Sequence, residues 1–381
     1  MPRFSLLSAA AMVILPGLIP GVAGLHPAPG PPQAPAAPAW HLALTRHFGG
    51  PGNASGYATI LMAGRQVWAF GGTNPGGPSS PVAARLTSKG WAFERLPGGL
   101  TDFISDASAT SAHGIWAVSA YGRYVLHWDG TRWQEARRWR GGTLSDVVAV
   151  GSQQAWVFGT SATGDRTIGT WRFDGRAWEP EGGIAADIYR ASAVSGRDIW
   201  AIAAGPRGDA ILHLGGRGWR RVPAARGMQA VRWHDILAES RSDVWLLGDT
   251  ASRSGSGRLL LARWNGAHWA IYRTHARAWA GQLSAASRGQ LLATATSSGP
   301  LTAGLIITMT DGGHMTWSRI SSRLGSGVTD VTFAPRTGTL WASGATLTRL
   351  GGDAAVWVHS ISRAASETAS DSDPAGRPDP S

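Results

Sequence analysis

Short apolar segments recur along the chain, separated by polar turns that are often rich in glycine. A tryptophan-centred core returns as QVWAFGG, GIWAVSA, QAWVFGT, DIWAIAA and DVWLLGD, with weaker copies QLLATAT and TLWASGA. The central residues are Trp68, Trp116, Trp156, Trp200, Trp245, Leu292 and Trp341. None of these segments has the 3.6-residue apolar spacing of a helix, so the pattern predicts strands. The copies are about 40 to 49 residues apart, which is the period of a four-stranded propeller blade.

Each unit divides into four predicted strands. An apolar strand such as SDVVAVG precedes the tryptophan-bearing strand, and a third strand such as YVLHWDG leads into a fourth that begins with tryptophan. Asp-Gly and Asn-Gly pairs between the third and fourth strands predict tight hairpins. The fourth-strand tryptophans are expected to fill the apolar space between adjacent blades; they are Trp91, Trp133, Trp178, Trp219, Trp269 and Trp317.

The seventh unit lacks a fourth strand of its own. Trp357 aligns with the third strand of the unit, and the chain then becomes polar. Residues 40–48, with Trp40 placed like a fourth-strand tryptophan, are predicted to supply the missing outer strand and so remove an open sheet edge. The sequence therefore predicts an all-β, seven-bladed β-propeller with four-stranded blades, whose last blade is closed by the N-terminal strand.

The segments that flank the repeats predict how the chain is organised. Residues 1–24 contain Arg3 and an apolar stretch interrupted by Pro16 and Pro20, which is typical of a cleaved signal peptide. We expect a Pro/Ala-rich linker at 25–39, the propeller domain at 40–362 and a disordered tail at 363–381. The protein is expected to be secreted, extracellular or associated with the cell envelope, with no transmembrane helix after the signal is removed.

Composition narrows the possible chemistry. The chain has no cysteine, which excludes disulfides and cysteine-bearing metal sites. The formal net charge is +11, so an acidic glycan, a cell-wall polyanion or a protein is the expected partner; a merely solvated basic surface is the alternative. The sequence shows no specific nucleic-acid motif, and we expect a monomer without a cofactor or metal.

The stretch TDGGHMTWSRI resembles the Asp-box repeat of bacterial secreted sialidase-like propellers. Asp311, Gly313, Thr316 and Trp317 match, with one extra residue between Gly313 and Thr316, and looser copies start at Asp129, Asp174 and Asn265. The repeat resemblance covers roughly residues 40–362. In that family the Asp-box is structural, so the resemblance implies a fold and assigns no catalytic residue.

An enzymatic role is the less favoured alternative. A sialidase-type reaction needs a nucleophile pair and an acid beside an arginine cluster. Here Glu94, Glu135, Glu179 and Glu181 follow outer-strand tryptophans and are expected at the periphery, while Glu239 ends an inner strand and Glu367 lies in the tail. An extracellular glycan hydrolase or lyase would use His234, Asp235 and Arg190 near the central channel. Streptogramin-lyase-like propellers use a central-channel histidine, which by resemblance implies His234.

A second set of residues recurs at one position of the repeat. Asp106, Asp146, Arg190 and Asp235 stand ten residues before their second-strand tryptophan, and Asp330 is nearly equivalent. These carboxylates either line the channel mouth and hold a cation, or accept backbone N–H bonds and connect neighbouring blades. The second interpretation is favoured, because a repeat fold uses the same buried acceptor in unit after unit.

Loops between blades predict a ligand-binding face. Arginine forks bind carboxylate or phosphate, and aromatic faces stack on sugars. The candidate ligand-binding residues are Arg138, Trp139, Arg140, Tyr189, Arg190, Arg232, Trp233, His234, His275, Arg277 and Trp279. The alternative is that Trp139, Trp233 and Trp279 cap blade interfaces while the arginines are solvated.

Overall fold

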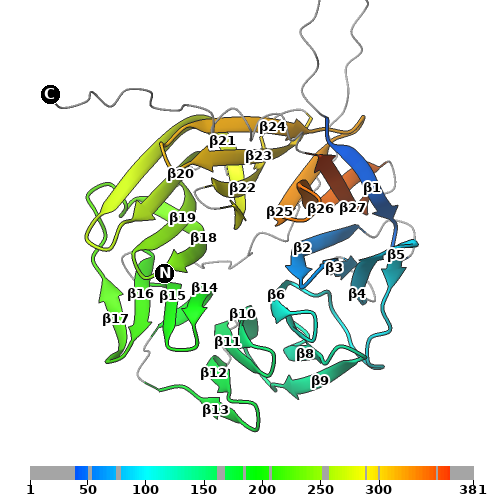
Figure 1. Ribbon diagram of the computed structural model, residues 1–381, viewed down its shortest axis with the longest axis horizontal. Coiled ribbons are helices and arrows are strands. Elements are labelled where there is room, and N and C mark those ends of the chain that lie inside the picture. Colours follow the sequence, from blue (N-terminus) through cyan, green and yellow to red (C-terminus); the bar gives the residue numbers. More distant parts are fainter. Residues whose placement is uncertain are drawn as a thin grey trace, which may run out of the picture.

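The computed structural model describes residues 39–49, 54–73, 79–160, 168–182, 186–205, 208–250, 257–287, 290–298, 301–348 and 351–360. Over these ranges all the named secondary-structure elements are β-strands, and they form six antiparallel sheets. Figure 1 shows the sheets around a central axis, with β2, β6, β10, β14, β18 and β25 lying nearest the axis. No helix in the described part is long and apolar enough to cross a membrane. The predicted signal peptide, the predicted tail and the predicted linker up to residue 38 lie outside the described residues.

Four of the sheets are consecutive four-stranded meanders, numbered from the inside outwards. The first contains β2 (Ser55–Ala63), β3 (Gln66–Thr73), β4 (Pro81–Thr87) and β5 (Gly90–Phe93). The second contains β6 (Asp106–Ser111), β7 (Gly114–Ser119), β8 (Tyr124–Trp128) and β9 (Trp133–Arg138). The third contains β10 (Thr143–Gly151), β11 (Gln154–Thr160), β12 (Gly169–Phe173) and β13 (Trp178–Pro180). The fourth contains β14 (Asp187–Ser195), β15 (Asp198–Ala204), β16 (Ala210–Gly215) and β17 (Gly218–Val222).

The fifth sheet is seven-stranded because one long strand serves two meanders. Its order is β18 (Val231–Ser240), β19 (Asp243–Thr250), β20 (Gly257–Trp264), β21 (Trp269–Ser287), β22 (Gln290–Ser297), β23 (Gly304–Thr310) and β24 (Met315–Ile320). β21 pairs with β20 from Trp269 to Ala278 and with β22 from Ala278 to Ser287. The strand is therefore outermost in the first half of this sheet (β18 to β21) and innermost in the second half (β21 to β24).

The sixth sheet joins the two ends of the described chain. Its order is β1 (His41–Arg46), β27 (Gly351–Ser360), β26 (Thr339–Thr348) and β25 (Ser326–Ala334). Leu42 pairs with Trp357, and Trp40 packs against the same cluster as Trp357, stacking on His359 with a ring separation of 5.1 Å. The prediction that the N-terminal strand closes the last repeat is confirmed.

The repeated turn between the third and fourth strands is capped by its first side chain. Asp129 Oδ1 accepts from the backbone N–H of Thr131 and Arg132, and Asp174 and Asn265 make the same two contacts in their own turns. Gly130 has φ 100°, a conformation that residues with a Cβ rarely adopt. A Cβ there would also approach His113 Nδ1 at 2.1 Å. The hairpins that these pairs predicted are confirmed.

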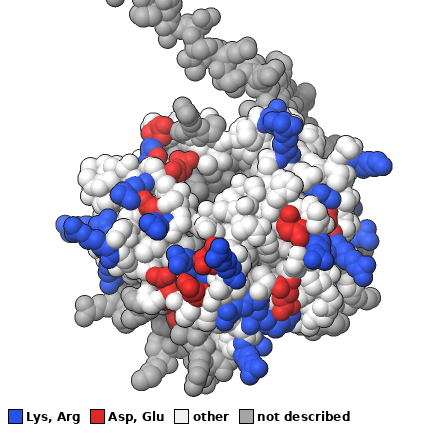
Figure 2. All heavy atoms as spheres, turned by 60° about the horizontal axis from the view of Figure 1, so that its bottom comes forward, with Lys and Arg blue, Asp and Glu red and all other residues white. Residues whose placement is uncertain are grey.

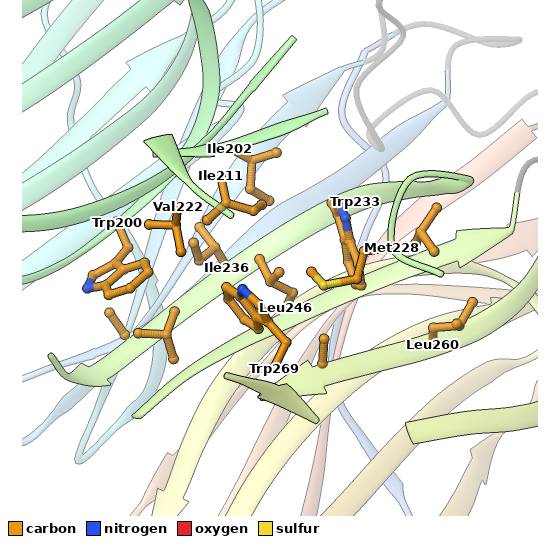
Figure 3. Packing of buried hydrophobic residues seen from close by; sticks show 14 residues of the cluster. Trp200, Ile202, Ile211, Val222, Met228, Trp233, Ile236, Leu246, Leu260 and Trp269 are labelled. Atoms are coloured by element: carbon orange, nitrogen blue, oxygen red, sulfur yellow. The ribbon is translucent and has the colours of Figure 1, made fainter. Parts of the chain in front are cut away.

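The core lies between sheets and is organised by pairs of tryptophans. A second-strand indole of one sheet meets a fourth-strand indole of the next nearly at right angles, with ring centroids about 6 Å apart. The pairs are Trp68 with Trp133, Trp116 with Trp178, Trp156 with Trp219, Trp200 with Trp269, and Trp341 with Trp91. Figure 3 shows one such cluster, in which Trp200 of β15 and Trp269 of β21 enclose Ile236 and Leu246. The expected role of these tryptophans between adjacent sheets is confirmed for these five pairs.

The second half of the seven-stranded sheet departs from this rule. Its hairpin pairs Met309 with Met315 across five turn residues, whereas Trp128 pairs with Trp133 across four. Met315 consequently occupies the register position that tryptophan holds elsewhere. Trp317 lies on the predicted fourth strand, two residues further along, and is 41 % exposed. Its sequence assignment as the inter-sheet tryptophan was wrong, because the hairpin closes at Met315 and leaves Trp317 two residues beyond the closing pair.

We expect replacement of one buried indole to cost far more stability than replacement of an exposed one. Trp156→Ala opens a cavity between two sheets, since Trp156 is 2 % exposed and faces Trp219, and should lower the free energy of unfolding by about 3–5 kcal/mol. Trp317→Ala is the matched control and should cost less than about 1 kcal/mol. Chemical denaturation of both variants measures the difference, and equal losses would contradict this account of the core.

Candidate functional site

A ring of polar side chains surrounds the central axis. Seven strands contribute one residue each at the same level: Thr59 of β2, Asp106 of β6, Asp146 of β10, Arg190 of β14, Asp235 of β18, Gln282 of β21 and Asp330 of β25. Five of these residues follow directly on a β-bulge, as in the register shifts between Leu144 and Asp146 and between Trp233 and Asp235. Bulges re-aim side chains, and here they direct polar groups toward the axis.

The carboxylates of the ring bind backbone groups of the neighbouring inner strand. Asp330 Oδ2 accepts from the N–H of Ile60 at 2.9 Å and from Thr59 Oγ1 at 2.8 Å, which joins β25 to β2. Asp146 accepts from Ala191 N–H at 2.5 Å, and Asp235 accepts from Leu283 N–H at 2.6 Å. These contacts bear out the interpretation that the acids connect adjacent repeats. Among the described residues, no group of three or more His, Asp or Glu side chains is arranged to hold a metal ion.

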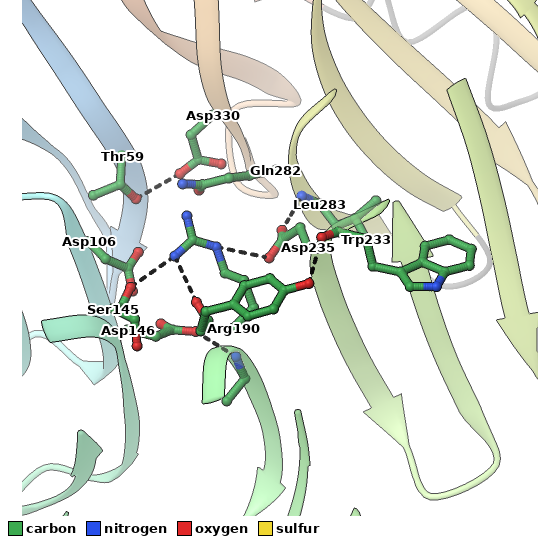
Figure 4. A network of polar contacts seen from close by, with 12 residues as sticks. Thr59, Asp106, Ser145, Asp146, Arg190, Trp233, Asp235, Gln282, Leu283 and Asp330 are labelled. Atoms are coloured by element: carbon green, nitrogen blue, oxygen red, sulfur yellow. Dashed lines mark hydrogen bonds and ion pairs between the residues drawn. The ribbon is translucent and has the colours of Figure 1, made fainter. Parts of the chain in front are cut away.

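Arg190 places a guanidinium among these carboxylates. Figure 4 shows its side chain reaching between β10 and β18; Nη1 donates to the carbonyl of Ser145 at 3.0 Å, and Nε lies 3.8 Å from Asp235 Oδ1. Burial lowers the pKa of Arg190, but Asp146, Asp106 and Asp235 outweigh it, so the net pKa is raised. Arg190 is therefore the internal counter-ion of the ring and is 9 % exposed.

Burial dominates the titration of the acids. It raises the pKa of Asp330 to about 7, against hydrogen bonds from Ile60 and Thr59 that lower it. It raises the pKa of Asp235 to about 6, with Arg190 acting in the opposite direction. The pKa of Asp146 is raised by burial and by the neighbouring Asp106.

A second polar cluster lies above the ring, at the face on which the inner strands begin. We call this the entry face; its connections run from the outer strand of one sheet to the inner strand of the next, as at 139–142, 223–230 and 321–325. His234 Nε2 is 2.6 Å from Asp249 Oδ2, and Arg232 Nη2 contacts both oxygens of the same carboxylate at 3.2 and 3.3 Å. Asp249 is fully buried, whereas the Arg232 side chain is 52 % exposed. The carboxylate thus orients an exposed guanidinium and a partly buried imidazole.

A neighbouring contact fixes the backbone under this cluster. Asp209 Oδ2 accepts from the N–H of Trp233 at 2.9 Å, and Tyr189 Oη donates to the carbonyl of Trp233 at 3.0 Å. Burial raises the pKa of Asp209, and Arg232 and His234 are near enough to lower it in part. Arg232 and His234 therefore flank a residue, Trp233, whose backbone N–H and carbonyl are both fixed by hydrogen bonds.

His234 and Asp235 do not face each other. Successive side chains of a strand point to opposite sides, and here His234 binds Asp249 while Asp235 binds Arg190 and Leu283. The sequence-predicted catalytic set of His234, Asp235 and Arg190 is thus divided between the cluster at the entry face and the buried ring.

The remaining candidate ligand residues are also separated by burial. Trp233 is 2 % exposed and belongs to the core, and Trp139 packs between two sheets against Trp171 and Trp178. Arg138 pairs with Glu135 at 2.6 Å and lies over the Tyr124 ring. The exposed members are Arg138, Arg140, Arg232, His275, Arg277 and Trp279. Figure 2 shows arginine and lysine interleaved with acids over one face of the molecule, around a centre of uncharged residues.

Sequence reasoning missed Asp249 and Asp209. Asp249 is the last residue of DVWLLGD, one copy of the tryptophan-centred repeat. The other tryptophan-bearing copies end in Gly, Ala or Thr. The charged residue at this position of a single copy could have identified Asp249 as a candidate site residue from the sequence. Asp209 lies next to a variable loop, so the repeat gives no reference position from which to detect it.

The comparisons with known proteins support the fold. No protein-family model matches the chain, and no curated protein matches it in sequence. Among solved structures, a catalytically inactive histidine-to-alanine variant of virginiamycin B lyase from Staphylococcus aureus, with quinupristin, has a TM-score of 0.56 at 10 % identity, covering 84 % of this chain and 100 % of its own. YCF48 from Cyanidioschyzon merolae has a TM-score of 0.53 at 14 % identity, covering 84 % of this chain and 98 % of its own. The GH74 xyloglucanase from Xanthomonas campestris has a TM-score of 0.55 at 14 % identity, covering 80 % of this chain and 53 % of its own.

These neighbours are β-propeller-type proteins, and the chain shares that fold. Identities of 10–14 % show the architecture alone. The predicted propeller and its repeats are therefore confirmed at the level of an all-β radial arrangement of sheets.

The raised pKa of Asp330 predicts a pH dependence of stability. A carboxyl whose folded pKa lies above its ordinary value of about 3.9 stabilises the fold fully below that value, and this contribution is lost as the pH rises through about 7. The loss amounts to about 1.4 kcal/mol for each unit of pKa shift. Asp330→Asn keeps a neutral side chain, so the wild type should lose stability relative to the variant between pH 5 and pH 8. Denaturant unfolding at several pH values measures this difference; a constant difference would rule out ionisation of Asp330 in that range.

Proposed function

We propose that this chain is a secreted, non-catalytic, seven-bladed β-propeller that binds an anionic polymer, glycan or protein partner on its entry face, at the cell envelope. The sevenfold count is supported by the two pairing partners of β21, which make one sheet the equivalent of two blades. It is also supported by seven inner strands that each contribute to the polar ring. Secretion rests on residues 1–24, and N-terminal sequencing of the mature protein tests it.

The observation that carries the binding proposal is the arrangement around Asp249. A fully buried carboxylate holds the exposed Arg232 by two contacts, which reduces the rotamer freedom that Arg232 loses when it binds a ligand. Arg140 and Arg277 are exposed on the same face, in the connection before β10 and at the point where β21 changes partner. Guanidinium groups at several inner strands suit a ligand with repeated carboxylate, sulfate or phosphate groups.

The ring below the entry face favours binding over chemistry deep in the channel. Its carboxylates accept backbone N–H bonds, and Arg190 extends across it from β14 toward Ser145 and Asp235. These acids are committed to holding neighbouring strands together. Their removal would disturb the framework first, so we assign ligand contacts to the exposed residues above them.

Retention on immobilised heparin and on polyphosphate tests the proposal. Replacing three exposed entry-face arginines by glutamine should weaken binding about tenfold to a hundredfold, since an exposed charged contact contributes about 0.5–1 kcal/mol. The variant is Arg140→Gln, Arg232→Gln, Arg277→Gln, and the charge-matched control on the opposite face is Arg65→Gln, Arg132→Gln, Arg217→Gln. Equal weakening in the control would mean that net charge alone is responsible and would overturn the entry-face assignment.

A second candidate function rests on the His234 and Asp249 pair. In the tautomer that carries the proton on Nε2, His234 donates to the buried Asp249 carboxylate at 2.6 Å and Nδ1 is available as a base. Arg232, which contacts the same Asp249 carboxylate, supplies a positive charge for a developing anion. The lyase neighbour, whose histidine-to-alanine variant is inactive, makes elimination or hydrolysis of an extracellular substrate the alternative.

Chromatographic conversion of quinupristin and of a set of acidic glycans by the wild type tests this alternative. Any conversion should fall at least about a hundredfold in His234→Gln and Asp249→Asn if the pair acts as a base. Full activity in both variants would exclude the pair, and absence of conversion by the wild type would leave binding as the function.

A further inference from the structure

Three large apolar side chains are exposed together on the entry face. Trp279, Leu301 and Leu324 are 42 %, 57 % and 39 % exposed. Trp279 lies where β21 leaves β20 for β22, Leu301 precedes β23, and Leu324 connects β24 to β25. All three therefore belong to the same edge of the second half of the seven-stranded sheet. We call Trp279, Leu301 and Leu324 the apolar patch.

Backbone contacts hold the three segments side by side. Trp279 pairs with Thr296 on β22, and Thr296 Oγ1 in turn contacts the backbone of Val328 on β25. The carbonyl of Thr302, next to Leu301, accepts from Ser326 N–H at 3.0 Å, two residues after Leu324. The patch thus sits on neighbouring, hydrogen-bonded segments of β21, β22 and β25.

The charged residues nearest the patch along the sequence are arginines. From residue 273 to residue 326 the sequence holds five arginines and one acid, Asp311. Asp311 lies in the β23–β24 turn at the opposite edge, where it pairs with Arg263 at 3.0 Å. Arg277 and Arg323 are both exposed and stand within two residues of Trp279 and Leu324.

From this combination we propose that the apolar patch inserts into the interface of an anionic phospholipid bilayer. Trp prefers the headgroup level of a membrane, leucines gain by leaving water, and arginines are attracted to anionic headgroups. A glycan would stack on the indole but would leave the two exposed leucines without a role. The inference deepens the proposed function, because it assumes that the entry face binds anions and names a lipid surface as the partner.

Co-sedimentation of the full mature chain with vesicles tests the inference. The probes are vesicles of phosphatidylcholine alone and of phosphatidylcholine with phosphatidylglycerol, each at low and high salt. The wild type should bind the mixed vesicles, and less at high salt because screening weakens the arginine contribution. The triple variant Trp279→Ser, Leu301→Ser, Leu324→Ser should bind at least about tenfold more weakly.

The chain provides a matched control. Trp317 and Leu42 are 41 % and 51 % exposed, nearly the same as the patch residues, but lie on the outer strands β24 and β1. Trp317→Ser, Leu42→Ser should bind vesicles within about twofold of the wild type. Circular dichroism and thermal unfolding check that both variants are folded.

The outcomes distinguish this inference from the broader proposal. If vesicle binding is absent while heparin and polyphosphate binding persist, the membrane inference is overturned and the proposed function stands. If the folded wild type binds neither vesicles nor heparin and polyphosphate, the membrane inference and the proposed function are both overturned. An equal loss of vesicle binding in the triple variant and in the control would show that the apolar patch is not the contact surface. Equal binding to the two vesicle types would show that anionic lipid is not required, and either result would refute the inference.

Discussion

The structure depends on one repeated contact, in which an indole on the second strand of a sheet meets an indole on the outer strand of the next. The chain has no cysteine, so no disulfide fixes the spacing of the sheets. At five sheet boundaries this spacing is set by perpendicular indole pairs whose centroids are 5.8–6.5 Å apart. Because these rings are large and rigid, they fix both the separation and the rotation between neighbouring sheets. Near the axis the same spacing brings each inner strand within reach of the next.

That spacing makes the buried ring possible. The N-terminal strand completes the last sheet, and Asp330 on the inner strand of that sheet binds Ile60 and Thr59 of the neighbouring β2. Burying several carboxylates is costly unless their oxygens find donors. Backbone N–H groups exposed at the bulges provide these donors, and Arg190 supplies charge. The tryptophan pairs at the periphery and the acids at the centre are thus two parts of one arrangement.

The sequence predicted the parts of this arrangement that repeat. The Asp129-Gly130 hairpin, the closing strand at residues 40–48 and the connecting role of Asp146 all followed from a motif compared with its own copies. The failures lie where one copy departs from the others. The β23–β24 hairpin closes at Met315 rather than at Trp317, and β21 continues unbroken where a boundary between two units was predicted. Asp249 was missed because its partner His234 is on another strand, and a repeat alignment gives positions within a unit rather than contacts across strands.

The exposed chemistry also lies at departures from the repeat, and the physics of a repeated fold explains why. A position that must carry the same inter-sheet contact in every unit cannot vary without opening a cavity or losing a hydrogen bond. Positions at the entry face bear no such constraint, since their backbone groups are already paired within strands or turns. Asp249 replaces a small or uncharged residue there, and it fixes Arg232 without altering the β19 ladder. Trp279 likewise points away from the buried Ala278 and Ala280 on its own strand. Binding groups can therefore be added on this face while the indole pairs and the ring stay unchanged.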